Sequence, residues 1–465
     1  MASSYSTVAE SALFSDAQLH DNEKSEQALR KEITASHHLI RNNPLLGIGA
    51  RRFRASCIGG GAKPVFDPKR FDADFAQAWK EWNLYCDFNE NTNFAGIQAL
   101  AVITMLIDGS GFIIRRRTLD NVPLQVQVVS PLSHASELER PGKGSYIRGG
   151  VLYAKNGKPK KYAFYKLPID HPEFDEESVN WLPVSDVIHL RDIIHAGQTT
   201  AQPWISAGAD FAKQYKDNQT VEIKSRMKRI GQQVFALRDT PPTQQKTAPG
   251  IPTVQEKLVI KAGGVTFLNG VKEIKTASPA EIAGNYQEHN NQVLRMIAGV
   301  LGITFEMLTG DLTQVNYSSI RAGMINHRRF IGQLRDINLI PAFNRVLGWF
   351  IEAYQLKTAK ELPGYFENPY QYLDPTWIWP EWEEIDPLKA AKALVLEIQN
   401  DITSLEEVSN GRGKTLDQHL DGVERSNDAL EKRGITKNEA SVEPDDKRTN
   451  ADDDNSSSSK SGSDS

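Results

Sequence analysis

The sequence predicts an α+β fold that contains more than one packing unit. Apolar residues recur at helical spacing up to residue 107 and again from residue 208 onward, whereas alternating apolar residues typical of strands dominate between residues 122 and 190. The chain of 465 residues is also longer than a single hydrophobic core usually supports. With 39% hydrophobic and 24% charged residues, the composition is that of a globular body.

The first predicted elements are helical. Residues 1–35 are polar and compatible with a helix but lack a long apolar stripe, so we expect an N-terminal arm, with the folded region beginning near Leu39. Aromatic residues at helical spacing predict a helix over 71–85, and an apolar run predicts a second helix over 94–107.

Strands are predicted next. Residues 122–128 alternate between apolar and polar side chains, and Asn156-Gly157 separates two strand-like runs. That dipeptide favours a two-residue hairpin turn. The run LPVSDVIHL, which ends at Leu190, is predicted as one strand.

A helix, an insert and a second helix are expected after the strands. Residues 208–234 carry an apolar stripe on their second half, which predicts a helix. The segment that follows is rich in proline and glycine turns, so we expect a compact insert with short strands. Residues 278–281 (SPAE) combine a capping box with proline at the first helical position, and predict a helix that ends near Gly302.

A basic cluster lies near the end of the 208–234 helix, and two interpretations of it stay open. The cluster is either a solvated helix face or a surface that contacts nucleic-acid phosphates without reading bases. Most of the net charge of −5 lies in residues 441–465, which hold seven acidic and three basic residues. The rest of the chain is therefore nearly neutral, and its overall charge does not predict nucleic-acid binding. The cluster consists of Lys224, Arg226, Lys228 and Arg229.

A polar segment, 302–317, interrupts two predicted helices. Connections between helices usually take about 2 to 8 residues, so the extra length suggests a functional loop. We expect Ser318 or Ser319 to cap the next helix, which runs to Tyr354 and should kink or break at Pro341.

The C-terminal part is predicted as a tryptophan-rich strand followed by helices. The dipeptide Asp386-Pro387 predicts the start of the first of these helices, and helical pieces continue to about Gly434. The rest of the chain is acidic and serine-rich, a composition that predicts disorder.

No motif in the chain predicts an enzyme. Two cysteines, Cys57 and Cys86, are too few for a disulfide framework, and the histidines lack the spacing of zinc ligands. The glycine run 59–61 lacks the Lys-Ser/Thr pair of a phosphate loop. We therefore expect no catalytic residue, no metal and no cofactor. The N-terminus does not resemble a signal peptide and no apolar run is long enough to span a bilayer, which favours a cytoplasmic chain with no membrane role.

Four sequence motifs together resemble the lambda-type portal proteins of tailed bacteriophages. The resemblance covers the body from about Ser36 to Gly434. One departure is the segment after SDVIHLRDII, where the family usually has an arginine-containing step and this chain has HAGQTTAQPW. The motifs are RNNP at 41–44, SDVIHL at 185–190, LTGDLTQVNYSSIR at 308–321 and WIWPEWEEIDPLKAAKA at 377–393.

The resemblance implies a portal fold assembled as a ring, typically of twelve copies. Each copy would have a mixed α/β wing, a helical stem, a small α/β clip, a tunnel loop and a mainly helical crown. The implied segments are the arm 1–35, wing 36–206, first stem helix 207–236, clip 237–277, second stem helix 278–301, tunnel loop 302–317, a long kinked helix closing the wing 318–376, crown 377–436 and a disordered tail 437–465.

The resemblance also implies a function and partners. The ring would occupy one capsid vertex of the virion after assembly in the host cytoplasm, and would conduct double-stranded DNA during packaging and ejection without regard to sequence. Its partners would be the terminase, the major capsid protein and the head-completion or tail connector proteins. An alternative from another class is a DNA-processing nuclease of the packaging apparatus. Residues expected to contact DNA are Asp311, Thr313, Gln314, Asn316 and Tyr317 in the tunnel loop, and Lys224, Arg226, Lys228 and Arg229 on the stem.

Overall fold

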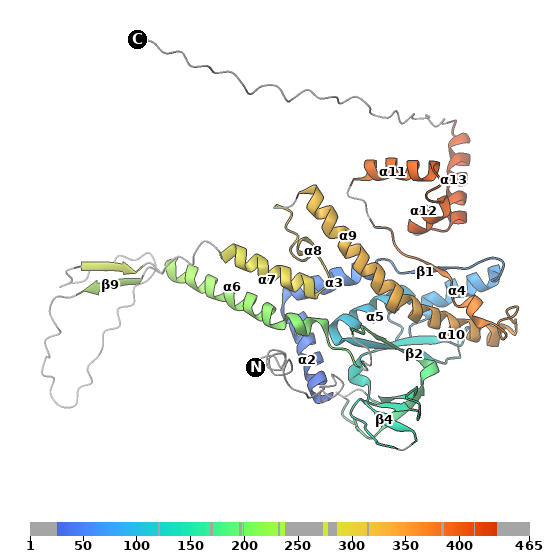
Figure 1. The fold of residues 1–465 in the computed structure, drawn as a ribbon, viewed down its shortest axis with the longest axis horizontal. Helices are drawn as coiled ribbons and strands as arrows, with labels where there is room; N and C mark the ends of the chain where they lie inside the picture. Colours follow the sequence, from blue (N-terminus) through green and yellow to red (C-terminus); the bar gives the residue numbers. More distant parts are fainter. Residues whose placement is uncertain are drawn as a thin grey trace, which may run out of the picture. The chain divides into compact units, whose positions relative to one another are not determined.

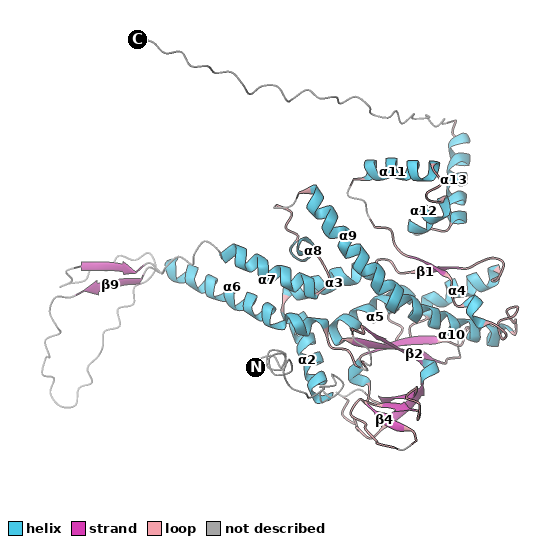
Figure 2. Ribbon diagram, viewed as in Figure 1, coloured by secondary structure: helices cyan, strands magenta, loops and turns pink. Residues whose placement is uncertain are grey.

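A computed structural model of the chain describes residues 26–119, 121–142, 144–167, 171–194, 198, 200–230, 233–237, 273–277, 286–313, 316–382, 386–412 and 414–434. The chain divides into two compact units, Met1–Gly413 and Lys414–Ser465. Helices and short antiparallel sheets alternate along the first unit, which confirms a mixed α and β fold (Figures 1 and 2). Within the described ranges, no helix combines the length and apolar character that a membrane span requires.

The N-terminal helices pack against one another at the start of the body. The helix α2 begins at Glu26, earlier than the sequence predicts, and is tied to the body by the hydroxyl of Ser36, which donates to the carbonyl of Ile107 at 2.6 Å. Its buried stripe is too short to be recognised, since Ile33 and Ser36 are its buried residues. The bounds are α2 Glu26–Asn42, α3 Pro44–Ile58, α4 Ala73–Tyr85 and α5 Phe94–Asp108.

The main core lies between these helices, a three-stranded sheet and the helix α10 (Ile340–Thr358). Phe350 of α10 packs edge-on or tilted against Trp79 and Trp82 of α4, at ring distances of 5.0 and 5.3 Å. The indole of Trp82 also donates to the carbonyl of Leu124 at 2.7 Å, which ties α4 to the sheet. The predicted aromatic stripe of this helix is therefore a core face.

The three-stranded sheet has the order β3-β2-β8, and all its pairs are antiparallel. A second, four-stranded sheet has the order β4-β5-β6-β7. The strands are β2 Ser110–Arg116, β3 Gln125–Val129, β4 Tyr146–Arg148, β5 Val151–Tyr153, β6 Pro159–Tyr165, β7 Val179–Pro183 and β8 Val187–Arg191.

The structure confirms the predicted hairpin but corrects the last strand. Gly157 adopts a positive φ of 78° in the connection between β5 and β6, but Asn156 does not, and residues 154–158 form a longer connection than the two-residue turn that the dipeptide favours. The run predicted as one strand, LPVSDVIHL, is broken by a 3₁₀ turn at Val184–Asp186, and its two parts belong to different sheets. Asp186 is buried at this turn and accepts from the guanidinium of Arg117 at 3.0 Å. A buried carboxylate paired with a largely exposed arginine therefore stands where a continuous strand was expected.

The two helices predicted to form the stem pack side by side (Figure 1). They are α6 Ala209–Ile230 and α7 Tyr286–Val300. The predicted first helix extended to Val234, but that residue lies in β9 (Gln233–Leu237), which pairs with β10 (Glu273–Ala277). The β-branched Val234 is as suited to a strand as to a helix end, so periodicity alone could not place the boundary. The capping box at 278–281 and residues 238–272 lie outside the described residues.

A long helical run follows α7 and breaks where proline predicts. It consists of α9 (Tyr317–Leu334), a π-helical turn at Arg335–Leu339, and α10, whose second residue is Pro341. The π turn precedes the proline because proline cannot donate a backbone hydrogen bond to the turn before it. This confirms the expected kink or break.

The last part of the first unit begins with a strand and ends with two helices. The strand β11 (Thr376–Ile378) pairs with β1 (Lys63–Val65). Asp386 caps α11 (Pro387–Gln399) by accepting from the backbone of Lys389, which confirms the predicted helix start. The helix α12 (Leu405–Gly411) follows. The described part of the second unit contains α13 (Leu416–Glu431).

Candidate functional site

The segment 302–317, predicted as one polar loop, is largely packed against the body. Thr304 caps the short helix α8 (Phe305–Thr309) by accepting from the backbone of Met307. Leu308 of this helix is buried. A Cβ atom at Gly49 of α3 would lie only 3.1 Å from the Cδ1 atom of Leu308, so α8 packs closely on α3. The first half of the predicted tunnel loop is therefore packed against the body of the protein. Sequence reasoning missed this because five residues are too few to show a helical period.

The exposed residues of the described part of 302–317 are Gly310, Leu312, Thr313 and Asn316. The helix α8 ends at Gly310, which adopts a left-handed conformation with φ of 73°. The carboxylate of Asp311 then accepts from both the backbone amide of Thr313, at 3.0 Å, and its hydroxyl, at 2.7 Å. These two hydrogen bonds lower the pKa of Asp311, which keeps it ionised. The side chain of Leu312 lies between them in the chain and is 60% exposed.

Asn316 has a structural role that the sequence assigned to a serine. Its side chain accepts from the backbone of Ser319 at 2.8 Å and caps α9, so the expectation that Ser318 or Ser319 is the cap is wrong. Asparagine stabilises this position as well as serine, and it precedes both serines, so the helix starts two residues earlier. Tyr317 is the first residue of α9, and Gln314 lies outside the described residues.

The basic cluster on α6 is partly neutralised by an acidic residue. The guanidinium of Arg226 donates to the carboxylate of Glu222 at 2.8 Å, and Glu222 is buried. Lys224 is exposed. Lys228 and Arg229 lie in the last turn of α6, but their side chains are outside the described part of the structure. A pair of this type is a common way to hold an arginine on a helix surface.

A second basic surface, on α9, was missed by sequence reasoning. This helix contains three arginines and no acidic residue, and Arg321 and Arg329 are exposed. The helix directly follows the exposed turn at Asp311, so the two features are joined in the chain. The signal was present in the sequence as the acid-free run YSSIRAGMINHRR.

The tryptophan-rich motif anchors this helical run through Arg335. The guanidinium of Arg335 donates to the carbonyls of Cys57, at 2.9 Å, and Ser56, at 3.0 Å. It also stacks on the rings of Trp379 and Trp382, at 4.3 and 5.2 Å. Burial lowers the pKa of Arg335 to about 10, so it remains charged at neutral pH. The motif therefore has a structural role at the π turn.

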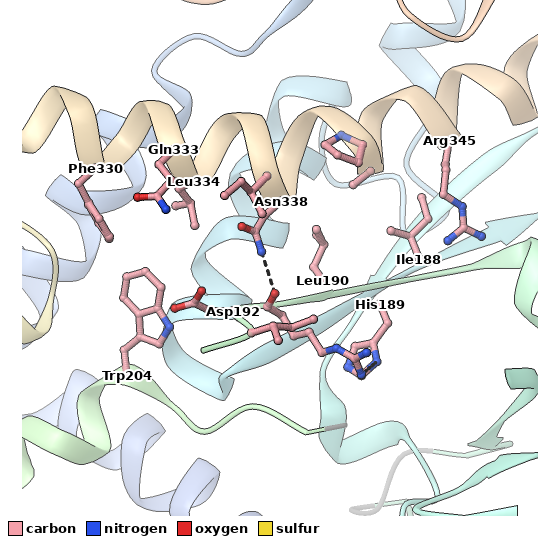
Figure 3. Close-up of a pocket in the computed structure, with 15 residues that line it drawn as sticks. Ile188, His189, Leu190, Asp192, Trp204, Phe330, Gln333, Leu334, Asn338 and Arg345 are labelled. Carbon is pink, nitrogen blue, oxygen red and sulfur yellow. Dashed lines mark hydrogen bonds between the residues drawn. The ribbon is translucent and has the colours of Figure 1, made fainter. Parts of the chain in front are cut away.

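A cavity of about 410 Å³ lies between the end of β8 and the helical run that contains Arg335 (Figure 3). The side-chain amide of Asn338 donates to the carbonyl of Arg191 at 2.7 Å across it. Trp204 and Phe330 close one end, and burial raises the pKa of Asp192 nearby. This hydrogen bond gives a partner to the carbonyl of Arg191, the last residue of the edge strand β8. Without it, that carbonyl would be an unpaired acceptor at the sheet edge.

The described residues contain no group of three or more histidine, cysteine, aspartate or glutamate side chains that could hold a metal ion. The two cysteines are buried, and burial raises the pKa of each thiol to about 12. Neither thiol is therefore a nucleophile at neutral pH.

Comparison with known proteins identifies relatives over most of the chain. The family model described as phage portal protein, lambda family, matches residues 15–335. A curated relative from Halomonas phage phiHAP-1, described as "Probable portal protein", is 23% identical over 381 residues, which cover 77% of this chain and 71% of the relative.

Solved structures of gene transfer agent particles also resemble the chain. The "Virion of native gene transfer agent (GTA) particle" is 11% identical with a TM-score of 0.47, and the match covers 82% of this chain and 93% of that chain. The "Neck of native GTA particle computed with C12 symmetry" is 12% identical with a TM-score of 0.45 and the same coverage, 82% and 93%.

Proposed function

This chain belongs to the lambda family of phage portal proteins, and we propose that twelve copies of it form a ring at one vertex of the capsid. The observation that carries the proposal is the family match over residues 15–335, which includes the segments predicted as wing, stem and tunnel loop and all of α9. The ring conducts double-stranded DNA during packaging and ejection. It is assembled in the host cytoplasm and remains in the virion, where it contacts the major capsid protein.

Electron microscopy of the purified protein tests this proposal directly. Rings with an axial hole support it. The second candidate function is a nuclease of the packaging apparatus, and compact monomers that cleave DNA in the presence of Mg²⁺ would favour that function. The family is structural rather than catalytic, which supports the ring.

We infer that the DNA-facing part of the tunnel loop is its second half, residues 311–317, and not the whole of 302–317, because Leu312, Thr313 and Asn316 are exposed. The hydrogen bonds of Asp311 fix the backbone at residues 311–313, and no lysine or arginine occurs in 302–317. A loop without cations does not grip passing phosphates, so the DNA slides.

A packaging assay tests this assignment. Replacing Asp311 and Gln314 by lysine introduces cations at the constriction, and we expect intact rings that package DNA more slowly or stall. The measurement is DNA packaged per procapsid against time, beside a ring count by microscopy. The control is Asp311→Asn, which can still accept from Thr313 but adds no positive charge. Normal packaging by intact lysine-substituted rings would show that this turn does not touch the moving DNA.

The clip is proposed to dock the terminase. The strand β9 begins three residues after α6 ends and pairs with β10, so both ends of the insert 237–277 lie side by side close to the end of α6 in the chain. Its turn-rich composition favours an exposed surface. Deleting residues 240–249 should weaken terminase capture in a pulldown while rings still form. The head-completion and tail connector proteins are further proposed partners of the ring.

A further inference from the structure

The small sheet that contains β4, β5 and β6 carries a dense charge of one sign. Residues 140–169 contain eight lysines and arginines and no aspartate or glutamate. Seven of the eight are exposed, and Lys143 lies outside the described residues. Four lysines fall within seven residues, in the connection between β5 and β6 and at the start of β6. We call these four residues the lysine hairpin: Lys155, Lys158, Lys160 and Lys161.

Neighbouring carboxylates do not neutralise the lysine hairpin. None of its four side chains pairs with an acidic side chain of the described residues. The strand β7, which pairs with β6, has the sequence VNWLP and adds no acidic residue. The nearest acidic residues along the chain are Glu139 and Asp170. The lysines therefore repel one another, and an anionic partner would offset that repulsion.

The lysine hairpin is presented from an ordered sheet. The backbone amide of Ala154 donates to the carbonyl of Lys158 at 2.8 Å, and the amide of Gly157 donates to the carbonyl of Ala154 at 2.9 Å. Further along β6, Phe164 is buried and packs edge-on against Phe112 of β2, at a ring distance of 5.1 Å. Because the backbone is already ordered, a partner that binds the lysines loses little free energy to ordering it.

The residue types indicate a nucleic-acid backbone and not a protein surface. Protein interfaces are depleted in lysine and centre on buried aromatic or arginine anchors. Residues 154–161 (AKNGKPKK) contain no aromatic residue, no arginine and no large apolar side chain. The lysine ammonium group is a point charge on a flexible stem, so it attracts phosphates without fixing their geometry. Contacts of this kind do not depend on base sequence.

We propose that the lysine hairpin is a further DNA-contact surface, which binds the phosphate backbone of double-stranded DNA without regard to sequence. The inference rests on the proposed function only for the identity of the polyanion, because the charge and exposure of the lysines do not depend on it. It adds a phosphate contact in the segment predicted as the wing to those considered on α6 and α9. Such contacts weaken as salt rises, because binding releases cations condensed on the DNA.

The salt dependence of DNA binding by the full chain tests the proposal. The probe is a short DNA duplex, titrated at several salt concentrations. The variant Lys155→Gln/Lys158→Gln/Lys160→Gln/Lys161→Gln should bind about tenfold or more weakly at low salt. Its slope of log K against log salt should fall by about 2 or more, because each lost phosphate contact removes about one unit of slope. Arginine at the same four positions keeps the charge and should keep both values.

The matched control removes four positive charges per copy from scattered exposed positions. Its slope should change by less than about 0.5, because exposed charges act over only about one Debye length. Circular dichroism and electron microscopy check that each variant folds and assembles as the unsubstituted chain does. If the fourfold hairpin variant does not fold, Lys158→Gln/Lys160→Gln replaces it, with an expected fall in slope of about 1. The control variant is Lys69→Gln/Lys80→Gln/Lys357→Gln/Lys392→Gln.

Four outcomes would overturn the proposal. An unchanged slope in the hairpin variant, with rings intact, would show that these lysines do not contact DNA, while the proposed ring would stand. Equal changes in the hairpin and control variants would mean that only the net charge matters. Normal DNA binding with poor incorporation of rings into procapsids would show that the hairpin contacts an acidic protein instead. An unsubstituted chain that stays monomeric and does not bind DNA would defeat both this inference and the proposed function.

Discussion

The side chain of Arg335 shows how a buried charge can be stabilised by carbonyls and rings rather than by a carboxylate. It makes two hydrogen bonds to backbone oxygens of α3 and stacks on two tryptophans. Guanidinium is planar and weakly hydrated, so it can do both at once, whereas an ammonium group cannot. The arginine therefore joins α3, the π turn and the tryptophan-rich segment.

Replacing Arg335 by lysine should lower the free energy of unfolding by about 2–4 kcal/mol, because hydrogen bonds are lost and a buried cation is left poorly paired. Urea unfolding followed by tryptophan fluorescence measures the change. Arg329→Lys, at an exposed position of α9, is the control and should change the free energy by less than about 0.5 kcal/mol. Equal effects of the two substitutions would show that the stack on Trp379 and Trp382 contributes nothing.

The buried His134 should make the body less stable in mild acid. Burial lowers its pKa to about 3, below the ordinary value of 6.5 in an unfolded chain. The unfolded state therefore binds the proton more readily, and the stability from neutral His134 is present above pH 6.5 and is lost as the pH falls from 6.5 toward 3. The loss is about 1.4 kcal/mol per pH unit within that window.

The variant His134→Asn should show a shallower fall in the free energy of unfolding between about pH 6 and 4.5, whatever its stability at neutral pH. His189, whose pKa is also lowered by burial, keeps part of the slope in the variant. Denaturant titrations at several pH values give the slopes, with His38→Asn, at an exposed position, as the control. A slope equal to that of the unsubstituted protein would mean that His134 takes up no proton on unfolding.

At the scale of the element, sequence patterns located long helices well and short or buried features poorly. The helix α5 and the start of α11 were predicted because an apolar run or a capping aspartate is a local property. The helix α8, the buried turn at Asp186 and the cap at Asn316 depend on partners far along the chain or on a choice between neighbouring polar residues. Local periodicity carries no information about such contacts.

The division of 302–317 into a packed half and an exposed half leads to a matched pair of substitutions. Leu308 is 1% exposed and Leu312 is 60% exposed. We expect Leu308→Ala to lower the free energy of unfolding by about 2–4 kcal/mol through the cavity it leaves, and Leu312→Ala to change it by less than about 0.5 kcal/mol. Urea unfolding measures the free energy of unfolding of the two variants. A large effect of Leu312→Ala would indicate that the turn is packed as well.

At the scale of the whole molecule, the candidate site was predicted in part. The polar character of residues 311–317 is a local property, and Leu312, Thr313 and Asn316 are exposed. That this segment faces DNA stays a prediction. The sequence favoured the cluster on α6 over the arginines of α9, because clustered charges are conspicuous in a sequence. The pairing of Arg226 with Glu222, four residues earlier on the same helix, could have been read from the sequence, but the burial of Glu222 could not. The family resemblance supplied the function, which no composition or spacing in this chain could have done.

The acidic tail is expected to be dispensable for assembly. The residues after Gly434 are mostly polar or charged and supply little apolar surface for an interface. A chain truncated after Gly434 should form rings with the same yield and subunit number, as measured by mass photometry. Loss of rings would reveal an ordered contact made by the tail.

The arginines of α9 and the basic residues of α6 can be ranked as phosphate contacts by the salt dependence of DNA binding. Each phosphate contact that is lost should reduce the slope of log K against log salt by about 1. Because Arg226 is already paired with Glu222, we expect Lys224→Gln/Arg226→Gln to change the slope less than Arg321→Gln/Arg329→Gln, although both remove two positive charges per copy. The measurement is the binding of purified rings to a short DNA duplex at several salt concentrations, with subunit number checked beside it. A larger change of slope in the α6 variant would mean that the stem residues, and not the α9 arginines, contact the DNA backbone. Equal slopes in both variants and in the unsubstituted ring would show that neither surface contacts DNA.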